Sequence, residues 1–250
     1  MAEWKHALVT GGNSGIGRAI ALAFAEEGIN VTICGRRADK LAEVAAESDR
    51  IHAVPADVTD EKSVTQLYEK AEAARGPFDV VVANAGIASS APAHRTSLEE
   101  WNRIIGVNLT GAFLTARPAL KGMADRKSGR IIFIASVAGL RGSAYVAPYV
   151  ASKHGVVGLT RALAAELLMT GVTVNAICPA YVETEMLEQS VQRVMEKTGR
   201  TEDEARRGFA ETNPNHRLIK PEEVAATAMW LISEAAGNVT GQPIAISGGG

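Results

Sequence analysis

The chain has 250 residues, a formal net charge of −2 and apolar side chains at 46% of its positions. This length is enough for one large domain or two small ones with a sizeable buried core. Because the charges are scattered and form no basic stripe, a nucleic-acid-binding surface is not expected. No apolar run reaches the roughly 18 residues of a membrane-spanning helix. The first residues, MAEWKHALVTGG, pass directly into a strand-like run, so we expect no secretory signal.

Short apolar runs rich in valine and isoleucine alternate with longer stretches that have helical spacing. The runs cover residues 6–10, 30–34, 51–55, 79–83, 130–136, 172–178 and 243–247. Continuous apolar strands separated by helices are typical of a parallel sheet with helices on both faces. No linker rich in proline or serine and no internal repeat divides the chain. We therefore expect one doubly wound α/β domain over residues 1–250, with a seven-stranded parallel sheet.

A glycine-rich turn follows the first strand, in the segment LVTGGNSGIGRAIALAFAEEG. Gly11, Gly15 and Gly17 precede a helix-like stretch whose apolar face continues through Ile20 and Phe24. Glycines at such a turn let the backbone approach a pyrophosphate. The following helix N-terminus offers free N–H groups and a partial positive charge. A purely structural turn is the alternative, but the position after the first strand favours dinucleotide binding.

The second strand ends in the segment VTICGRRADK. A carboxylate at this strand end would bind the ribose 2′-hydroxyl of NAD and repel the 2′-phosphate of NADP. Gly35 occupies that place here, followed by Arg36 and Arg37. A guanidinium can hold a phosphate through two hydrogen bonds, although a pair of exposed loop arginines is also common. The pattern favours NADP(H) as cofactor, with NAD(H) as the alternative.

Two tyrosines four residues apart precede a lysine in the segment YVAPYVASKHGVVGLTRALAAEL. Tyr149 and Lys153 share one helix face because four residues separate them, and Pro148 suits the first turn of that helix. Tyr145 has a tyrosine rather than a lysine at this spacing. Ser136, in FIASVAG, is expected at the carboxyl edge of the fifth strand, where the sites of such sheets form. Residues placed only for packing are the alternative interpretation.

Several motifs in this order resemble the classical short-chain dehydrogenase/reductase family. They are the Thr10-Gly11-x-x-x-Gly15-x-Gly17 turn, Asn84-Ala85-Gly86, Asn108 in GVNLTG, and the set of Ser136, Tyr149 and Lys153. The resemblance runs from Thr10 to the final TGQPIAISGGG, which is nearly the whole chain. It implies a Rossmann fold and an enzyme that interconverts a ketone and a secondary alcohol with a nicotinamide cofactor.

The resemblance also implies a catalytic tetrad of Asn108, Ser136, Tyr149 and Lys153. In this set the nicotinamide supplies the hydride, and the tyrosine passes a proton to or from the substrate oxygen. The lysine ammonium and an oxidised nicotinamide would lower the tyrosine pKa from its unperturbed value near 10. The serine would stabilise the developing alkoxide. The lysine would also bind the nicotinamide ribose, and the asparagine would hold a water molecule that links the lysine to solvent.

Cofactor contacts follow from the same resemblance, position by position. They fall on Gly11, Asn13, Ser14, Gly15, Ile16, Gly17, Arg36, Asp57, Val58, Asn84, Ala85, Gly86, Tyr149, Lys153, Pro179, Val182 and Thr184. Asp57 and Val58 would lie at the adenine ring, and Val182 and Thr184 at the nicotinamide amide. For Thr184, a helix N-cap is a second interpretation.

Three positions depart from the family pattern. Ser14 stands where a basic residue is frequent, and Ala83 replaces the first of two asparagines. Ala180 follows Pro179 where the family usually has glycine, so a turn that needs a positive φ angle at this position would be strained.

Residues 183–216 form a long, charged segment without strand-like runs. Two solvated helices would explain it, but we favour a lid over the substrate, because long insertions at the carboxyl ends of strands often carry specificity. The substrate wall is expected to include Ser136, Leu140, Tyr145, Tyr149, Tyr181, Met186 and Leu187.

Segments such as VTVNAICPAYVETEM look like the bacterial ketoreductases of fatty-acid and polyketide synthesis. The first hypothesis is therefore an NADPH-dependent reductase of a 3-oxoacyl thioester or similar β-keto compound. Basic residues that could contact its carrier, or simply form a solvated helical face, are Lys197, Arg200, Arg206, Arg207 and Arg217. The second hypothesis is a dehydrogenase of a hydrophobic or cyclic secondary alcohol. The third, a non-catalytic dinucleotide-sensing protein, is disfavoured by the intact tetrad.

The remaining expectations concern partners and surroundings. Family analogy implies a homotetramer, with small residues such as Gly155, Gly158, Ala162 and Ala165 on helix faces that could pack against a copy. Cys34 and Cys178 lie in separate apolar runs and are interpreted as buried hydrophobic residues, which suits a reducing cytoplasm. The histidines His94, His154 and His216 lack partners at ligand spacing, so no metal site is expected.

Overall fold

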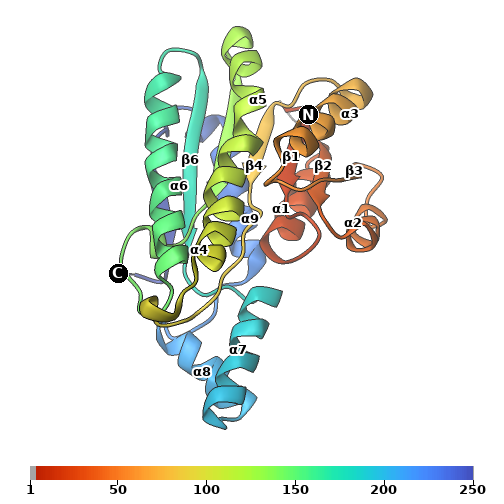
Figure 1. Ribbon diagram of the computed structural model, residues 1–250. Coiled ribbons are helices and arrows are strands. Elements are labelled where there is room, and N and C mark those ends of the chain that lie inside the picture. Colours follow the sequence, from red (N-terminus) through yellow and green to blue (C-terminus); the bar gives the residue numbers. More distant parts are fainter. Residues whose placement is uncertain (1–3, 250) are drawn as a thin grey trace.

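The computed structural model describes residues 4–249, and a seven-stranded parallel sheet forms its centre (Figure 1). The strands are β1 His6–Thr10, β2 Asn30–Gly35, β3 Ile51–Pro55, β4 Val80–Ala83, β5 Gly129–Ile134, β6 Val172–Pro179 and β7 Pro243–Ile246. Their spatial order is β3-β2-β1-β4-β5-β6-β7, so the direction of winding changes between β1 and β4. The expected doubly wound Rossmann fold with seven parallel strands is confirmed.

The central strands are buried along their whole length, as their continuous apolar runs predict. Every residue of β1, β4, β5 and β6 is buried, because helices cover both faces of the sheet. β5 ends at Ile134, two residues before the end of the apolar run. Ser136 therefore lies just beyond the strand, in extended backbone that leads into the short 3₁₀ turn Val137–Gly139.

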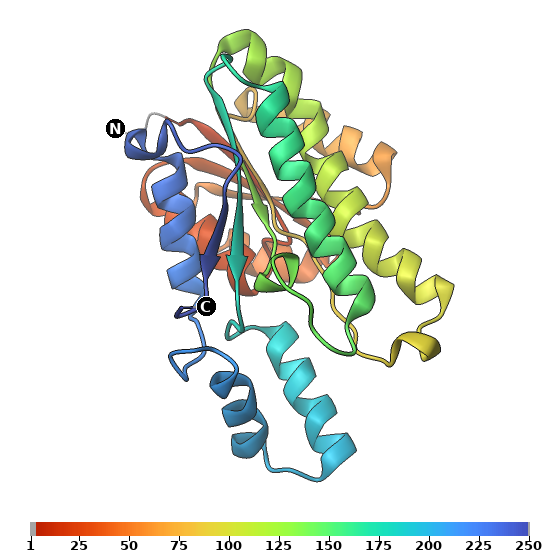
Figure 2. The ribbon, with the colours of Figure 1, turned by 90° about the vertical axis from the view of Figure 1, so that its left-hand side faces the viewer.

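Helices cover the two faces of the sheet in two layers (Figure 2). One layer contains α1 Gly15–Glu26, α2 Ala38–Ala45 and α9 Pro221–Ile232, and the other contains α3 Glu61–Arg75, α4 Leu98–Ile105, α5 Gly111–Arg126 and α6 Ala147–Glu166. Phe24 and Leu231 belong to the core under the first layer, and Leu67, Phe133 and Val156 belong to the core under the second. A π-helical turn, residues 106–110, joins α4 to α5 and contains Asn108.

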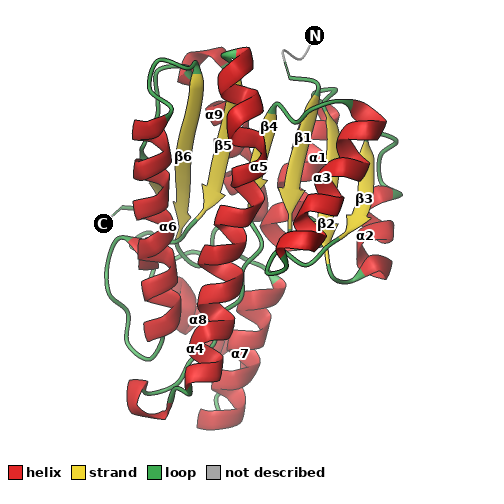
Figure 3. Ribbon diagram, turned by 45° about the horizontal axis from the view of Figure 1, so that its top comes forward, coloured by secondary structure: helices red, strands yellow, loops and turns green. Residues whose placement is uncertain are grey.

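Two further helices project beyond the carboxyl ends of the strands (Figures 1 and 3). They are α7 Glu185–Thr198 and α8 Glu202–Glu211, and we call residues 185–211 the α7–α8 arm. The arm has its own small core, in which Leu187, Val191 and Ala205 are buried. Within residues 4–249, no helix has both the length and the apolar character needed to cross a bilayer.

Candidate active site

The glycine turn after β1 is built for close backbone contact. Gly11 and Gly15 have φ angles of 66° and 51°, which other residues adopt only with strain. A Cβ atom at Gly17 would lie 2.3 Å from the carbonyl oxygen of Gly11. The side chain of Ser14, at the N-cap of α1, makes no capping hydrogen bond. The turn thus presents a helix N-terminus without side-chain cover, and such an N-terminus fits the pyrophosphate of a dinucleotide.

Asn84 holds this turn from the neighbouring strand. Its Nδ2 donates to the carbonyl oxygens of Thr10 at 2.8 Å and Gly11 at 3.3 Å. In return, Thr10 Oγ1 accepts from the backbone N–H groups of Asn84 at 3.0 Å and Ala85 at 3.1 Å. Because one asparagine makes these bonds, the alanine at position 83 leaves the connection between β1 and β4 intact. The side chain of Asn84 therefore supports the turn, and the backbone beside it borders the site.

A side chain at the end of β2 would require Asn13 to move. A Cβ atom at Gly35 would lie 2.8 Å from Asn13 Oδ1. Arg36 is exposed. Partial burial acts to raise the pKa of Asp57, but hydrogen bonds from Thr59 and the charge of Arg36 hold this pKa below its ordinary value. The opposite charges of Arg36 and Asp57 therefore interact at the adenosine end of the expected cofactor site.

Two other predicted cofactor contacts have packing roles visible in the structure. Ile16 is half-buried against the core below α1. Val58 is buried, and its Cγ2 would lie 2.8 Å from a Cβ at Gly111, so it packs tightly against the start of α5. Both residues remain predicted cofactor contacts, and both pack against neighbouring residues.

The side chain of Ser136 lies next to Tyr149, close enough to influence the pKa of the phenol. Ser136 Oγ also accepts from the N–H of Ala138 at 3.1 Å and donates to the carbonyl oxygen of Pro179 at 3.4 Å. Burial raises the pKa of Tyr149, and the neighbouring Ser136 side chain only partly offsets this effect. The protein alone therefore does not produce the lowered Tyr149 pKa that the sequence predicts. Desolvation of the phenolate changes this pKa more than the neighbouring groups do.

Lys153 lies one helical turn after Tyr149 and is buried. Its Nζ donates to the carbonyl oxygen of Ile134 at 2.8 Å and lies 5.6 Å from the centre of the Tyr149 ring. Burial lowers the pKa of Lys153 to about 8, with the neighbouring Cys178 opposing this shift. The structure thus brings Ser136, Tyr149 and Lys153 together at the carboxyl edge of the sheet.

Asn108 joins three parts of the site through its side-chain amide. Its Oδ1 accepts from the N–H of Ile87 at 2.9 Å, and its Nδ2 donates to the carbonyl oxygen of Ile87 at 3.0 Å and to Ser152 Oγ at 3.0 Å. A Cβ at Gly86 would lie 3.5 Å from Asn108 Oδ1 and 3.6 Å from Lys153 Nζ. Asn108 and Lys153 therefore border the same small space behind Gly86.

The loop after β6 reaches the glycine turn from the opposite side. Ala180 does not adopt a positive φ angle, and its N–H donates to the carbonyl oxygen of Ile246 at 2.9 Å, so the strain considered from the sequence is absent. Val182 is buried and pairs with Ile219 in an isolated β-bridge. Thr184 is the N-cap of α7, and its Cγ2 would lie 3.0 Å from a Cβ at Gly15. Residues 179–184 thus form one wall of the site.

The predicted substrate wall is only partly supported. Leu140, Tyr145 and Tyr181 are 41%, 65% and 37% exposed, so their side chains are available to a ligand. Met186 is half-buried. Leu187 is only 4% exposed because it packs between α7 and α8, so its assignment to the substrate wall is corrected.

Tyr145 and Tyr181 are held in place by their neighbours. Tyr145 has a φ angle of 66°, and its carbonyl oxygen accepts from the N–H of Ala91 at 2.8 Å. The Tyr181 ring contacts Phe209 of α8 at a centroid distance of 5.0 Å. One tyrosine therefore connects the loop before α6 to the loop after β4, and the other connects the loop after β6 to the arm.

Two of the basic residues considered for carrier binding are already engaged. Arg206 forms an ion pair with Glu188, which joins α8 to α7, and a second with Glu202 within α8. Arg217 forms a two-pronged pair with Glu223, with N–O distances of 2.6 and 2.7 Å. Arg206 and Arg217 therefore support the fold of the arm and its base, and a carrier would have to compete with these ion pairs for them.

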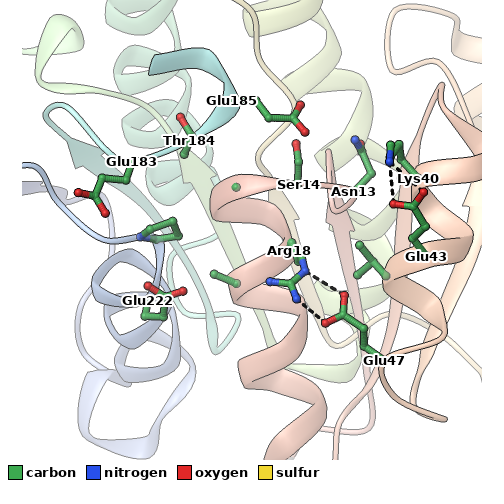
Figure 4. A pocket seen from close by; sticks show the side chains of 14 residues that line it. Asn13, Ser14, Arg18, Lys40, Glu43, Glu47, Glu183, Thr184, Glu185 and Glu222 are labelled. Atoms are coloured by element: carbon green, nitrogen blue, oxygen red, sulfur yellow. Dashed lines mark hydrogen bonds and ion pairs between the residues drawn. The ribbon is translucent and has the colours of Figure 1, made fainter. Parts of the chain in front are cut away.

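An open pocket of about 420 Å³ lies on the outer side of the glycine turn (Figure 4). Asn13, Ser14 and Gly15 line it together with side chains from α2 and Thr184 from the start of α7. The pairs Arg18–Glu47 and Lys40–Glu43 lie along its edge. Neither Ser136 nor Tyr149 lines this pocket, so it borders the expected cofactor site without containing the reacting groups. Among residues 4–249, no cluster of three or more potential metal-binding side chains occurs.

Sequence reasoning assigned no role to Ser152, which is fully buried and joins the Asn108 side chain to the carbonyl oxygen of Tyr149. Ser152 follows Tyr149 by three residues, so the two share one helix face, and this spacing could have indicated a role for Ser152 in the site. The oxygen of Thr10, which accepts two backbone hydrogen bonds, was part of the recognised turn but not of the expected site.

Replacing the buried Lys153 by methionine is expected to change how stability depends on pH. The lysine pKa of about 8 lies below its ordinary 10.5, so the unfolded chain binds more protons between these values. The stability of the parent protein therefore rises with pH across this window. Between about pH 7 and about pH 10, the free energy of unfolding of the parent should rise relative to that of Lys153→Met by at most roughly 3 kcal/mol. Urea unfolding at the two pH values measures this change. A difference that is constant with pH would contradict the lowered pKa.

Comparison with known proteins finds relatives that match the full length of the chain. A profile of the family described as short chain dehydrogenase matches residues 5–194. D-beta-hydroxybutyrate dehydrogenase of Cupriavidus necator is 40% identical, over 100% of this chain and 98% of that protein. Acetoacetyl-CoA reductase of Shinella zoogloeoides is 38% identical, over 97% of each. The structure of an actinorhodin polyketide ketoreductase variant with NADPH covers 100% of this chain and 98% of its own, at 37% identity and a TM-score of 0.95.

Proposed function

Since this chain belongs to the short chain dehydrogenase family, we propose that it reduces the ketone of a 3-oxoacyl thioester, or of a similar β-keto compound, with NADPH. The observation that carries the proposal is the placement of the Ser136 side chain next to Tyr149, beside the buried Lys153. These three groups lie at the sheet edge that also bears the glycine turn. The relatives named acetoacetyl-CoA reductase and polyketide ketoreductase support the substrate class.

In the proposed reaction Tyr149 donates the proton that the ketone oxygen needs. A raised pKa keeps the phenol neutral near pH 7, and a neutral phenol is a donor, which favours reduction over oxidation in this range. Ser136 Oγ, which lies next to Tyr149, would hydrogen-bond the same substrate oxygen and stabilise its developing charge. Bound NADPH would supply the hydride.

Lys153 and Asn108 are the other two members of the proposed tetrad. The ammonium of Lys153, held by the carbonyl oxygen of Ile134, would favour the phenolate left after proton donation. Asn108 positions α6 by holding Ile87 and Ser152. It also borders the space beside Lys153 Nζ in which a water molecule could carry protons from solvent.

The proposed NADP(H) preference rests on the end of β2. Gly35 leaves no carboxylate to repel a 2′-phosphate, and Arg36 lies exposed beside Asp57. Arg36→Ala is expected to weaken NADPH binding by about ten- to hundredfold, the usual range for losing hydrogen bonds to a charged group. NADH binding should change little. Fluorescence titration of both cofactors measures the ratio, and an equal loss for the two would remove the argument for NADP(H).

A dehydrogenase of a hydrophobic or cyclic secondary alcohol is the second candidate. The similarity to D-beta-hydroxybutyrate dehydrogenase and the exposed side chains of Leu140, Tyr145 and Tyr181 favour it. Initial rates followed at 340 nm would decide between the candidates. The panel pairs reduced cofactors with β-keto thioesters and simple ketones, and oxidised cofactors with secondary alcohols. Faster turnover of simple alcohols than of any β-keto thioester would replace the first candidate by the second.

We also propose a cytoplasmic homotetramer in which residues 185–211 act as a lid. Gly158, Ala162 and Ala165 are exposed along α6, and Trp101 and Phe113 are exposed on α4 and α5, so these faces are available to a copy of the chain. Gly155 instead packs against Leu109 of its own chain, where a Cβ would come within 2.7 Å. Light scattering that shows a stable monomer would reject the tetramer.

A further inference from the structure

An ion pair connects the end of β2 to the start of the α7–α8 arm. Arg37 is the N-cap of α2, and Glu185 is the first residue of α7. Arg37 Nη2 lies 3.1 Å from Glu185 Oε2, although 148 positions separate the two residues in sequence. The connection therefore crosses from the adenosine side of the expected cofactor site to the helix that begins the arm.

The neighbouring arginines Arg36 and Arg37 face different parts of the protein. The charge of Arg36 acts on Asp57, which follows β3, whereas the guanidinium of Arg37 is bonded to α7. Figure 4 shows the Glu185 side chain extending from the start of α7 toward the side of the pocket on which Asn13 and Lys40 lie. The charge of Arg36 thus acts on a residue after β3, whereas the Arg37 side chain reaches the start of α7.

The start of α7 is also in contact with the glycine turn itself. Thr184, which precedes Glu185, lies close to Gly15. A Cβ atom at Gly15 would be 3.0 Å from Thr184 Cγ2. A movement of α7 away from α2 would therefore uncover the N-terminus of α1.

We propose that Arg37 and Glu185 fasten the α7–α8 arm over the cofactor and so slow cofactor release, and that Arg37 takes no part in recognising the 2′-phosphate. The inference rests on the proposed binding of a nicotinamide cofactor beside the glycine turn. It separates two roles that adjacent arginines would otherwise share: Arg36 determines which cofactor binds, and Arg37 determines how long either cofactor stays.

The test measures dissociation rates of NADPH and of NADH by stopped-flow fluorescence. Arg37→Gln and Glu185→Gln should each release both cofactors about two- to fivefold faster, because an exposed ion pair contributes a modest free energy. The two side chains are 51% and 54% exposed, so the effect should shrink in about 1 M salt. The double variant Arg37→Gln/Glu185→Gln should be no faster than either single variant, since both remove the same contact.

Two control variants separate this role from its alternatives. Glu196→Gln changes an exposed acid near the other end of α7 and should leave both dissociation rates unchanged. Arg36→Gln should affect NADPH and leave NADH as in the parent. Faster release of NADPH alone in Arg37→Gln, with Glu185→Gln behaving as the parent, would make Arg37 a phosphate ligand and overturn the inference.

The remaining outcomes distinguish the inference from the function on which it rests. If the parent protein binds both reduced cofactors, and Arg37→Gln, Glu185→Gln and the double variant release them at the parent rate, the fastening role is wrong and the proposed function stands. If the parent binds neither reduced cofactor in equilibrium titration, the proposed function fails and the inference fails with it.

Discussion

Replacing Tyr149 by phenylalanine is expected to lower the turnover number for ketone reduction by about a hundred- to ten-thousandfold, the usual contribution of a general acid. The substitution removes the hydroxyl next to Ser136 and leaves the ring beside Lys153 in place. The affinity for the reduced cofactor should stay close to that of the parent, because no step of cofactor binding needs the proton. Steady-state rates at 340 nm and a fluorescence titration measure the two effects separately.

Tyr145→Phe is the matched control for this variant. It removes the same atom four residues earlier, from a side chain that is 65% exposed at the mouth of the site. The control should retain turnover within a few-fold of the parent, since its hydroxyl has no place in the proposed proton transfer. Parent-like reduction by Tyr149→Phe, or a comparable loss in Tyr145→Phe alone, would show that the wrong tyrosine has been assigned.

Replacing Gly17 by alanine is expected to disable the glycine turn. The new Cβ would lie 2.3 Å from the Gly11 carbonyl oxygen and 2.5 Å from Asn84 Nδ2. The first of these is a backbone atom, so relief requires movement of the turn and loss of the Asn84 hydrogen bonds that hold it. Forcing an extra carbon into a packed site costs about 1–3 kcal/mol. We expect this loss in urea unfolding, together with at least about tenfold weaker binding of either cofactor.

Gly208→Ala provides the control for the glycine substitution. Gly208 lies inside α8, where a new Cβ would be 4.0 Å from Arg200 Nη1, an ordinary contact distance. Alanine is the better helix former, so this variant should be as stable as the parent or slightly more stable. Cofactor binding by Gly17→Ala at the parent affinity would mean that the turn adapts and that its close packing is not needed.

The sheet could be predicted from the sequence because its signals are local. Strands buried on both faces consist of continuous apolar residues, and these runs cover the observed strands to within two residues. The position of Ser136 followed from its place at a strand end, and the proximity of Tyr149 to Lys153 from the helical repeat. Each of these inferences needs only the geometry of one element and the rule that parallel strands end at the same edge.

The errors came from contacts between elements. The apolar stripe of α7 was assigned to the substrate side, whereas Leu187 packs toward α8, because a stripe shows which face is buried but not what covers it. The ion pairs of Arg206 with Glu188 and of Arg217 with Glu223 could not be predicted from residue spacing, because each joins residues of different elements. The raised pKa of Tyr149 depends on burial in the folded protein, which no spacing of residues reveals.

The central claim is that the Tyr149 hydroxyl exchanges a proton with the substrate oxygen, and a crystal structure with NADP⁺ and a bound ketone tests it most directly. We predict that the ketone oxygen lies about 3 Å from both Tyr149 Oη and Ser136 Oγ, with its carbonyl carbon facing the nicotinamide ring. A ketone oxygen bonded to other groups, or a nicotinamide bound away from Tyr149, would contradict the account.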